Sequence, residues 1–317
     1  MRREDMQGRT QAKGALLLLL TALIWGAAFT AQSKGMQSVQ AFTFNAVRMT
    51  MGAAVLAPFI LVRGRLSAKK LTAAQLAEKK ISDRKALWQG ALLGVVFFAA
   101  SNIQQHAFLY TQSGKIAFIT ALYIFFVPIF SLFIKKRTPL MTWLCVILGF
   151  AGLYFLCVDP KDLGGLNRGD LLAIGCAAVF ALHILLIEKF TAGSDGLRLS
   201  AMQFLVGGTL SGIAMFIFEE PKLSGIFDAA VPLLYAGVMS CGVAYTLQII
   251  GQKYTEATVA SLLLCMESVF GVLCAAVILG ERLTLREVIG CAIMFAAIIL
   301  SQFSQKFTKA GENKKTA

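Results

Sequence analysis

Charged residues are scarce in this sequence. Only 15% of its 317 residues are Asp, Glu, Lys or Arg, whereas 57% are hydrophobic, and the mean hydropathy is +0.71. A soluble domain of this length needs more polar side chains to cover its surface. The composition therefore excludes a soluble globular protein and predicts an all-α, polytopic membrane protein.

The sequence also lacks every motif that would indicate an enzyme. It contains no HExxH, GxSxG or Walker loop, and its two histidines lie far apart without a Ser or Cys motif beside either. The seven cysteines form no CxxC pair and fall in or at the edge of apolar runs, where small buried thiols are typical. We expect no enzyme activity, no cofactor and no metal site.

Acidic residues are fewer than basic ones, 17 against 30, which gives a net charge of +13. The basic residues lie in short connections between apolar runs, without zinc-ligand spacing or an aromatic platform. Membrane orientation explains this pattern better than nucleic-acid binding, so we expect a lipid bilayer and no nucleic acid as the surroundings.

Long apolar runs, by contrast, are abundant. We predict ten membrane-spanning helices, since only helices satisfy their own backbone in lipid at these lengths. They cover about 14–33, 41–62, 87–110, 115–134, 140–158, 170–188, 199–218, 229–250, 257–280 and 283–304. The N-terminal run also has the form of a signal peptide, but the repeat described below requires it as a helix.

Lys and Arg counts predict the orientation. With the N-terminus inside, the inner segments hold 22 basic residues and the outer segments hold 7. Both termini should therefore be cytoplasmic, at residues 1–13 and 306–317, in a cytoplasmic membrane. The longest polar segment, 63–86, is strongly basic, and we expect a cytoplasmic loop that forms a surface helix.

The two halves of the chain repeat. A shift of 144 residues places QQHAFLYTQSG, which includes Gln104, on QIIGQKYTEAT, which includes Gln248; upstream, a shift of 155 lays GALLLLLTAL over GDLLAIGCAA. Each half, 14–158 and 159–305, contains five spans. Because five is odd, the second copy must enter the membrane the other way up. The fold predicted is a 5+5 inverted-topology repeat, which places a substrate site near the midplane between the halves.

The ninth run contains one charged residue, Glu267, near its middle. A charge at that depth costs about 3 to more than 10 kcal/mol, so it normally faces a bundle interior or a wet cavity. Glu267 is therefore a candidate for substrate binding and for proton coupling.

Other polar residues lie inside the predicted spans. The third span carries Ser101, Asn102, Gln104, Gln105 and His106 on one broad face, which lines either a cavity or a hydrogen-bonded helix contact. For Arg48, with Asn45 one turn before it, pairing with a helix carbonyl or a headgroup competes with substrate binding. His183 is a proton relay or a satisfied interhelical bond. Trp25 and Tyr123 lie at mid-span depth and suit cavity walls, whereas Tyr245 suits a belt or a wall.

Three stretches of the sequence resemble the EamA-type branch of the drug/metabolite transporter superfamily: TALIWGAAFT, QHAFLYTQSGKIAFITALYIFFVPIF and YTEATVASLLLCMESVFGVLCAAVILGERLTLREVIG. The resemblance implies a ten-helix inverted repeat around a central cavity, with members that export amino acids and other small metabolites. It makes cavity candidates of Trp25, Gln105, His106, Tyr123, His183, Tyr245 and Glu267. The family's usual Glu-Pro is Glu267-Ser268 here, so a kink is not predicted by proline, and the helix-end Gly-Glu occurs as Gly280-Glu281 only in the second half.

These observations predict a secondary transporter that exports amino acids or similar small polar or amphipathic metabolites, with Glu267 as the proton-sensitive group. An uncoupled facilitator of the same fold is the alternative within this class. A membrane-embedded enzyme or receptor is the alternative from another class; an enzyme would need a reactive constellation, and a receptor would usually carry a soluble signalling domain. The substrate, the energy coupling and the oligomeric state are left open by the sequence.

Overall fold

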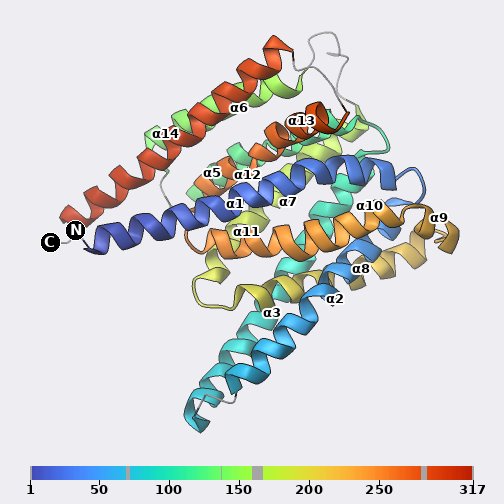
Figure 1. Ribbon diagram of the computed structural model, residues 1–317, viewed down its shortest axis with the longest axis horizontal. Helices are drawn as coiled ribbons and strands as arrows, with labels where there is room; N and C mark the ends of the chain where they lie inside the picture. The colour runs from blue at the N-terminus through green and yellow to red at the C-terminus, as the bar shows by residue number, and fades with distance from the viewer. Residues whose placement is uncertain (1, 69–71, 137, 159–166, 280–283, 316–317) are drawn as a thin grey trace.

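The computed structural model is built from helices and contains no strand in the residues it describes, which are 2–68, 72–136, 138–158, 167–279 and 284–315 (Figure 1). Side chains are described in these ranges except at 2–9, 67–68, 73–74, 275–279 and 302–315. The helices are α1 (Arg2–Gly35), α2 (Ala41–Ala68), α3 (Ala73–Ala107), α4 (Ser113–Thr120), α5 (Tyr123–Phe133), α6 (Leu140–Cys157), α7 (Arg168–Thr191), α8 (Gly196–Phe218), α9 (Leu223–Asp228), α10 (Ala230–Leu234), the π-helix η2 (Tyr235–Ala244), α11 (Tyr245–Gln252), α12 (Ala257–Leu264), α13 (Met266–Leu279) and α14 (Leu285–Lys315).

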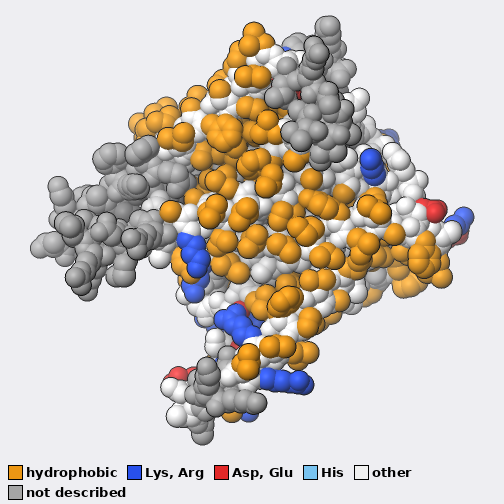
Figure 2. Space-filling view, in the orientation of Figure 1, with side chains coloured by type: hydrophobic (Ala, Val, Ile, Leu, Met, Phe, Trp, Pro, Cys, Tyr) orange, Lys and Arg blue, Asp and Glu red, His pale blue; other side chains and the backbone are white. Residues whose placement is uncertain are grey.

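Within the described part of the chain, nine segments are long and apolar enough to span a membrane, and they coincide with the first nine predicted spans. The tenth predicted range falls in α14, which is not among these nine segments but packs along α6 at the edge of the bundle (Figure 1). Hydrophobic side chains far outnumber charged ones across the described part of the face shown in Figure 2, as expected for a surface that meets lipid. The protein is thus an all-helical, multi-pass membrane protein.

The prediction that 63–86 forms a separate surface helix was wrong. Its described residues instead extend the two neighbouring spans, α2 to Ala68 and α3 from Ala73. Lys, Arg, Ala, Gln and Glu are strong helix formers, and Thr72 and Gln75 form a capping box that starts α3. The Gly280-Glu281 pair lies outside the described residues.

The connections between helices lie at two opposite ends of the bundle, the termini face and the far face. The termini face carries 134–136, 138–139, 192–195 and 253–256, and both chain ends lie toward it; the far face carries 36–40, 108–112 and 219–222 (Figure 1).

Residues related by the 144-residue shift touch one another in the centre of the molecule. The Tyr123 hydroxyl donates to Glu267 Oε1 at 3.3 Å, and the Cys265 thiol points to the Ala121 carbonyl at 3.7 Å, both across a separation of 144 residues. Equivalent residues can meet only beside the axis that relates the two copies. This axis therefore passes between the α4–α5 and α12–α13 breaks, which both interrupt the fourth helix of a half.

Contacts further from the axis repeat as well. A Cβ on Gly14 would lie 2.6 Å from Thr255 Oγ1, and a Cβ on Gly169 would lie 2.5 Å from Thr111 Oγ1. Gly14 and Gly169 are 155 residues apart, and Thr111 and Thr255 are 144 apart. The same close helix contact between the two halves thus forms twice, at opposite faces of the bundle.

The 144-residue shift between the halves changes by one residue at the π-helix η2. Gly94 approaches the Gln203 carbonyl and Val206, and Gly237 approaches the Arg48 carbonyl and Met51. The contacted residues differ by 155 positions, but the two glycines differ by 143 rather than 144. The second half therefore holds one extra residue between Gly237 and the cavity residue Gln248, and η2 accommodates it as a wide turn.

Gly26 brings α1 against α13 directly beside Glu267. A Cβ there would lie 2.7 Å from the Gly271 nitrogen and 2.8 Å from the Glu267 carbonyl, both backbone atoms that cannot move aside cheaply. We expect Gly26→Ala to destabilise the protein by about 1–3 kcal/mol, because α1 must shift. The measurement is the thermal midpoint of the purified protein in detergent.

Gly175→Ala in α7 is the matched control, because nothing lies within 4 Å of the Cβ it would add. It should leave the midpoint unchanged or raise it, since alanine favours a helix over glycine by about 1 kcal/mol. Equal midpoints for the two variants would contradict the tight α1–α13 contact.

Candidate functional site

A central cavity with about 500 Å³ of empty space, open solvent at its mouth included, lies on the axis between the halves. Its lining contains five pairs of residues related by the repeat: Trp25 with Phe180, Phe29 with Ile184, Gln104 with Gln248, Thr120 with Leu264, and Tyr123 with Glu267. Ala28, Gln32, Arg48, Ser240 and Tyr245 complete it. A cavity shared equally by two inverted halves is the arrangement expected of a membrane transport site.

Glu267 and Tyr123 form the centre of the cavity. Each is 4% exposed, and each stands in the first turn of a half-helix, Tyr123 in α5 and Glu267 in α13. The helix dipole favours negative charge near such a start. The helix is interrupted between α12 and α13 although this segment contains no proline, and the Ser268 nitrogen donates to the Cys265 carbonyl across only three residues.

Arg48 also lines the cavity and is 2% exposed. Its Nε donates to Asn45 Oδ1 at 2.7 Å and its Nη1 to Gln32 Oε1 at 3.0 Å, and the guanidinium lies over the Phe44 ring. Across the residues with described side chains, no carboxylate lies within ion-pair distance of Arg48. A buried cation held only by neutral amides is costly unless something else compensates it.

The predicted site residues divide into two groups. Trp25, Tyr123, Tyr245, Glu267, Arg48 and Gln248 line the central cavity, whereas Asn45, Asn102, Gln105, His106 and His183 do not. On the third span, Gln104 faces the cavity and donates to Thr120, and the neighbouring Gln105 is buried with no hydrogen-bond partner among the described residues. His106 lies instead in a second cavity at the far face.

His183 lies behind the cavity wall. Its Nε2 and Gln203 Oε1 are 2.7 Å apart, and its ring packs among Phe97, Phe180 and Tyr245. Of the two readings of His183 from the sequence, a proton relay or an interhelical hydrogen bond, this placement agrees with the hydrogen bond.

Sequence reasoning missed Gln32, Thr120, Phe180 and Ser240 in the cavity lining. The repeat carried a usable signal for two of them: Phe180 is the equivalent of Trp25, and Thr120 the equivalent of Leu264, in the same span as Glu267. Nothing in the local sequence marked Gln32 or Ser240.

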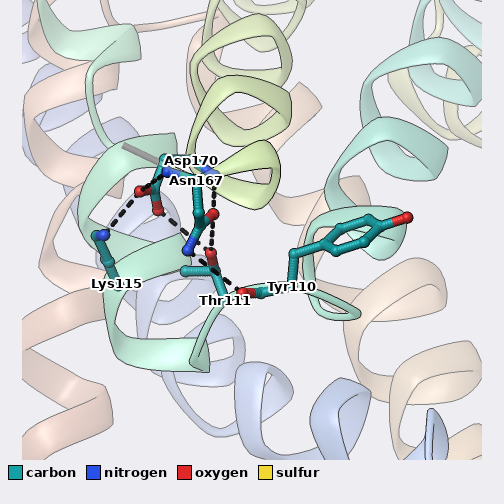
Figure 3. Close-up of polar contacts among 5 residues, drawn as sticks. All are labelled: Tyr110, Thr111, Lys115, Asn167 and Asp170. Carbon is teal, nitrogen blue, oxygen red and sulfur yellow. Dashed lines mark hydrogen bonds and ion pairs between the residues drawn. The ribbon is translucent and has the colours of Figure 1, made fainter. Parts of the chain in front are cut away.

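A further polar network was also missed, at the far face (Figure 3). Lys115 Nζ pairs with Asp170 Oδ2 at 2.7 Å, and the Thr111 hydroxyl donates to Asn167 Oδ1 and Asp170 Oδ1. Asn167 and Asp170 form a capping box at the start of α7, which is a sequence pattern that could have been found. The network ties the start of α4 to α7.

Comparison with known proteins decides the family. The model of the EamA-like transporter family matches residues 12–158 and again 167–303, which together cover most of the chain. The protein belongs to the EamA-like transporter family. The two matches coincide with the two halves related by the repeat.

Relatives of this EamA-family protein are themselves named only as transporters. One from Archaeoglobus fulgidus, named an uncharacterized transporter, is 28% identical over 89% of this chain and 83% of its own length. One from Clostridium kluyveri, with the same description, is 24% identical over 96% of this chain and 97% of its own. The uncharacterized inner membrane transporter YedA of Escherichia coli K12 is 23% identical over 90% of this chain and 89% of its own.

A solved crystal structure has the same fold as this EamA-family protein. It superposes with a TM-score of 0.72 at 19% sequence identity, over 92% of this chain and 96% of the other. At this identity the likeness concerns the fold alone. The family match together with the membrane-spanning helices makes the protein a multi-pass membrane transporter, which implies a small-molecule substrate and a lipid environment.

Proposed function

We propose that this EamA-family transporter exports amino acids or similar small zwitterionic metabolites across the cytoplasmic membrane. The observation that carries the proposal is a cation and an acid, Arg48 and Glu267, on the wall of one central cavity. An amino acid bears a carboxylate and an ammonium group at once, so it complements such a pair.

Arg48 is the proposed partner of the substrate carboxylate. A guanidinium can bind a carboxylate with two parallel, charge-assisted hydrogen bonds, which are about twice as strong as bonds between neutral groups. The amide oxygens of Gln32 and Asn45, its present acceptors, are weaker partners. A substrate carboxylate would therefore compensate a buried charge that the described side chains leave without a counter-ion.

Glu267 is the proposed partner of the substrate ammonium and the proposed site of proton coupling. A proton and an ammonium group would compete for the same carboxylate, so export of one substrate could be exchanged for entry of a proton. Trp25, Phe29, Phe180 and Tyr245 offer apolar surface for the remainder of the substrate.

The proposed orientation places the termini face in the cytoplasm. It rests on the 22 basic residues predicted for that side against 7 for the other.

A ligand panel tests the zwitterion proposal. Leucine carries both charges, leucinol carries only the ammonium group, and the keto acid of leucine carries only the carboxylate. We expect leucine to raise the thermal midpoint of the purified protein most, because only leucine carries both charged groups. A ligand present at a hundred times its Kd stabilises the native state by about 2.7 kcal/mol. A midpoint raised equally by all three compounds, or by sugars and nucleobases but not by amino acids, would overturn the proposal.

A further inference from the structure

A second, larger cavity opens at the far face, lined by the connection after α1, the start of α2, the end of α3 and the end of α8 with the connection that follows it. Its empty space, open solvent at the mouth included, is about 1170 Å³, and its lining includes Met36, Thr43, His106 and Glu219. Met36 lies just beyond the end of α1, four residues after the central-cavity residue Gln32, and Thr43 precedes Arg48 on α2. The two cavities are therefore separated by little more than one helical turn.

A series of hydrogen bonds connects residues that line the two cavities. Gln32 accepts from Arg48, Asn45 Oδ1 accepts from Arg48 Nε, and Asn45 Nδ2 donates to Asn102 Oδ1 at 2.8 Å. The Asn102 carbonyl then lies 2.7 Å from His106 Nδ1, in the wall of the far-face cavity. The series thus joins α1, α2 and α3, starts in one cavity and ends in the other.

The second half holds a hydrogen bond at the equivalent pair of positions. Ser200 lies 155 residues after Asn45, and Thr246 lies 144 residues after Asn102. Their hydroxyl oxygens are 2.7 Å apart, between α8 and α11, and both residues are buried. Because the halves are inverted, this second bond lies on the termini side of the central cavity, where α8 starts and α11 ends.

We propose that these two hydrogen-bonded pairs are the gates of the central cavity: Asn45–Asn102 toward the far face and Ser200–Thr246 toward the termini face. Opening the first joins the central cavity to the far-face cavity, which then serves as the route out of the protein. The inference rests on transport through the central cavity and deepens the proposed function by naming the contacts that control access to it.

Arg48 couples the far-face gate to the substrate site. Its Nε is bound to Asn45, a member of the gate, and its Nη1 to Gln32. A substrate carboxylate that takes over the guanidinium removes the Nε–H donor that holds the Asn45 side-chain oxygen in place. A ligand shifts an equilibrium only if it interacts differently with the two states, and this exchange of partners provides the difference.

The test measures access to the central cavity from each side. Ser240, which lines the cavity, is replaced by cysteine in a protein whose seven native cysteines have been removed. A membrane-impermeant thiol reagent is applied to right-side-out or inside-out vesicles. We expect Ser200→Ala to speed labelling from the termini face by about two- to tenfold, the effect of losing its one hydrogen bond to Thr246. Asn45→Ala should speed labelling from the far face by at least as much, because it removes the bonds to Asn102 and to the Ser101 carbonyl and the acceptor of Arg48 Nε.

Ser131→Ala is the matched control, because the Ser131 hydroxyl is buried but bonds only within its own helix, to the Val127 carbonyl. It should change labelling from neither side. Should Asn45→Ala fail to fold, Asn102→Ser shortens the other gate residue and has the same expected effect.

Labelling that rises from the same side in both gate variants, or that stays at the wild-type rate in folded variants, would overturn the proposal. The reagent reports access without any substrate. Failure here would therefore leave the recognition of zwitterions by Arg48 and Glu267 to be judged by the ligand panel alone.

Discussion

Replacing Glu267 with glutamine should abolish the pH dependence of substrate binding and of transport. Glutamine keeps the size and the hydrogen-bonding capacity of the side chain but cannot exchange a proton. In the wild type, lowering the pH should weaken binding of an amino acid, because the protonated carboxyl no longer attracts the ammonium group. In Glu267→Gln, binding should be weak and nearly constant across the pH range. The measurements are binding and efflux in proteoliposomes from mildly acidic to mildly alkaline pH.

Tyr123→Phe separates the charge of Glu267 from its hydrogen bond. This variant keeps the carboxyl group but removes the hydroxyl that donates to it at 3.3 Å. We expect it to retain a pH dependence, displaced along the pH axis because the carboxylate has lost a donor. If folded Glu267→Gln titrates like the wild type, Glu267 is a packing residue and the uncoupled facilitator becomes the better description.

Replacing Arg48 with glutamine should weaken amino-acid binding by about 100-fold or more. Two charge-assisted hydrogen bonds to a buried carboxylate are together worth about 3 kcal/mol or more, and each 1.4 kcal/mol is a factor of ten. Glutamine is the residue at the equivalent position of the other half, where Gln203 is buried and hydrogen-bonded to His183, so the bundle already accommodates a glutamine at this kind of position. Isothermal titration calorimetry or thermal shift would measure the loss.

Arg63→Gln serves as the control for this substitution. Arg63 lies in the extension of α2, its side chain is 65% exposed, and it is 3.4 Å from Asp195. Its replacement should leave binding unchanged, and Arg48→Gln should affect leucinol far less than leucine, since leucinol has no carboxylate. Equal losses for both ligands would mean that Arg48 supports the structure of the cavity rather than the recognition of a carboxylate.

The repeat was the most informative feature of the sequence. The 144-residue shift set Gln104 against Gln248, and both line the central cavity. The same shift relates Tyr123 to Glu267, which hydrogen-bond across the axis. A search for polar residues at equivalent positions would therefore have marked more of the site than the search for charges alone.

The side chains that turn toward the cavity were harder to predict. Gln104 and Gln105 are neighbours on one polar face of α3, yet only Gln104 lines the cavity. Their difference of about 100° in direction is set by how α3 is rotated against its neighbours. That rotation depends on contacts such as Gly94 against the Gln203 carbonyl, between segments more than a hundred residues apart.

The sequence by itself determined that this is a membrane-spanning helical protein, where its first nine spans lie and that its halves repeat. Those properties are local, because apolar length decides what can span a bilayer and duplicated residues can be read along the chain. Only the tertiary structure decided that Arg48, Gln32 and Glu267 share one cavity, that Asn45 meets Asn102, and that one extra residue is absorbed as a π-helix. Each of these depends on the rotation and close approach of helices from distant segments, which no single span specifies.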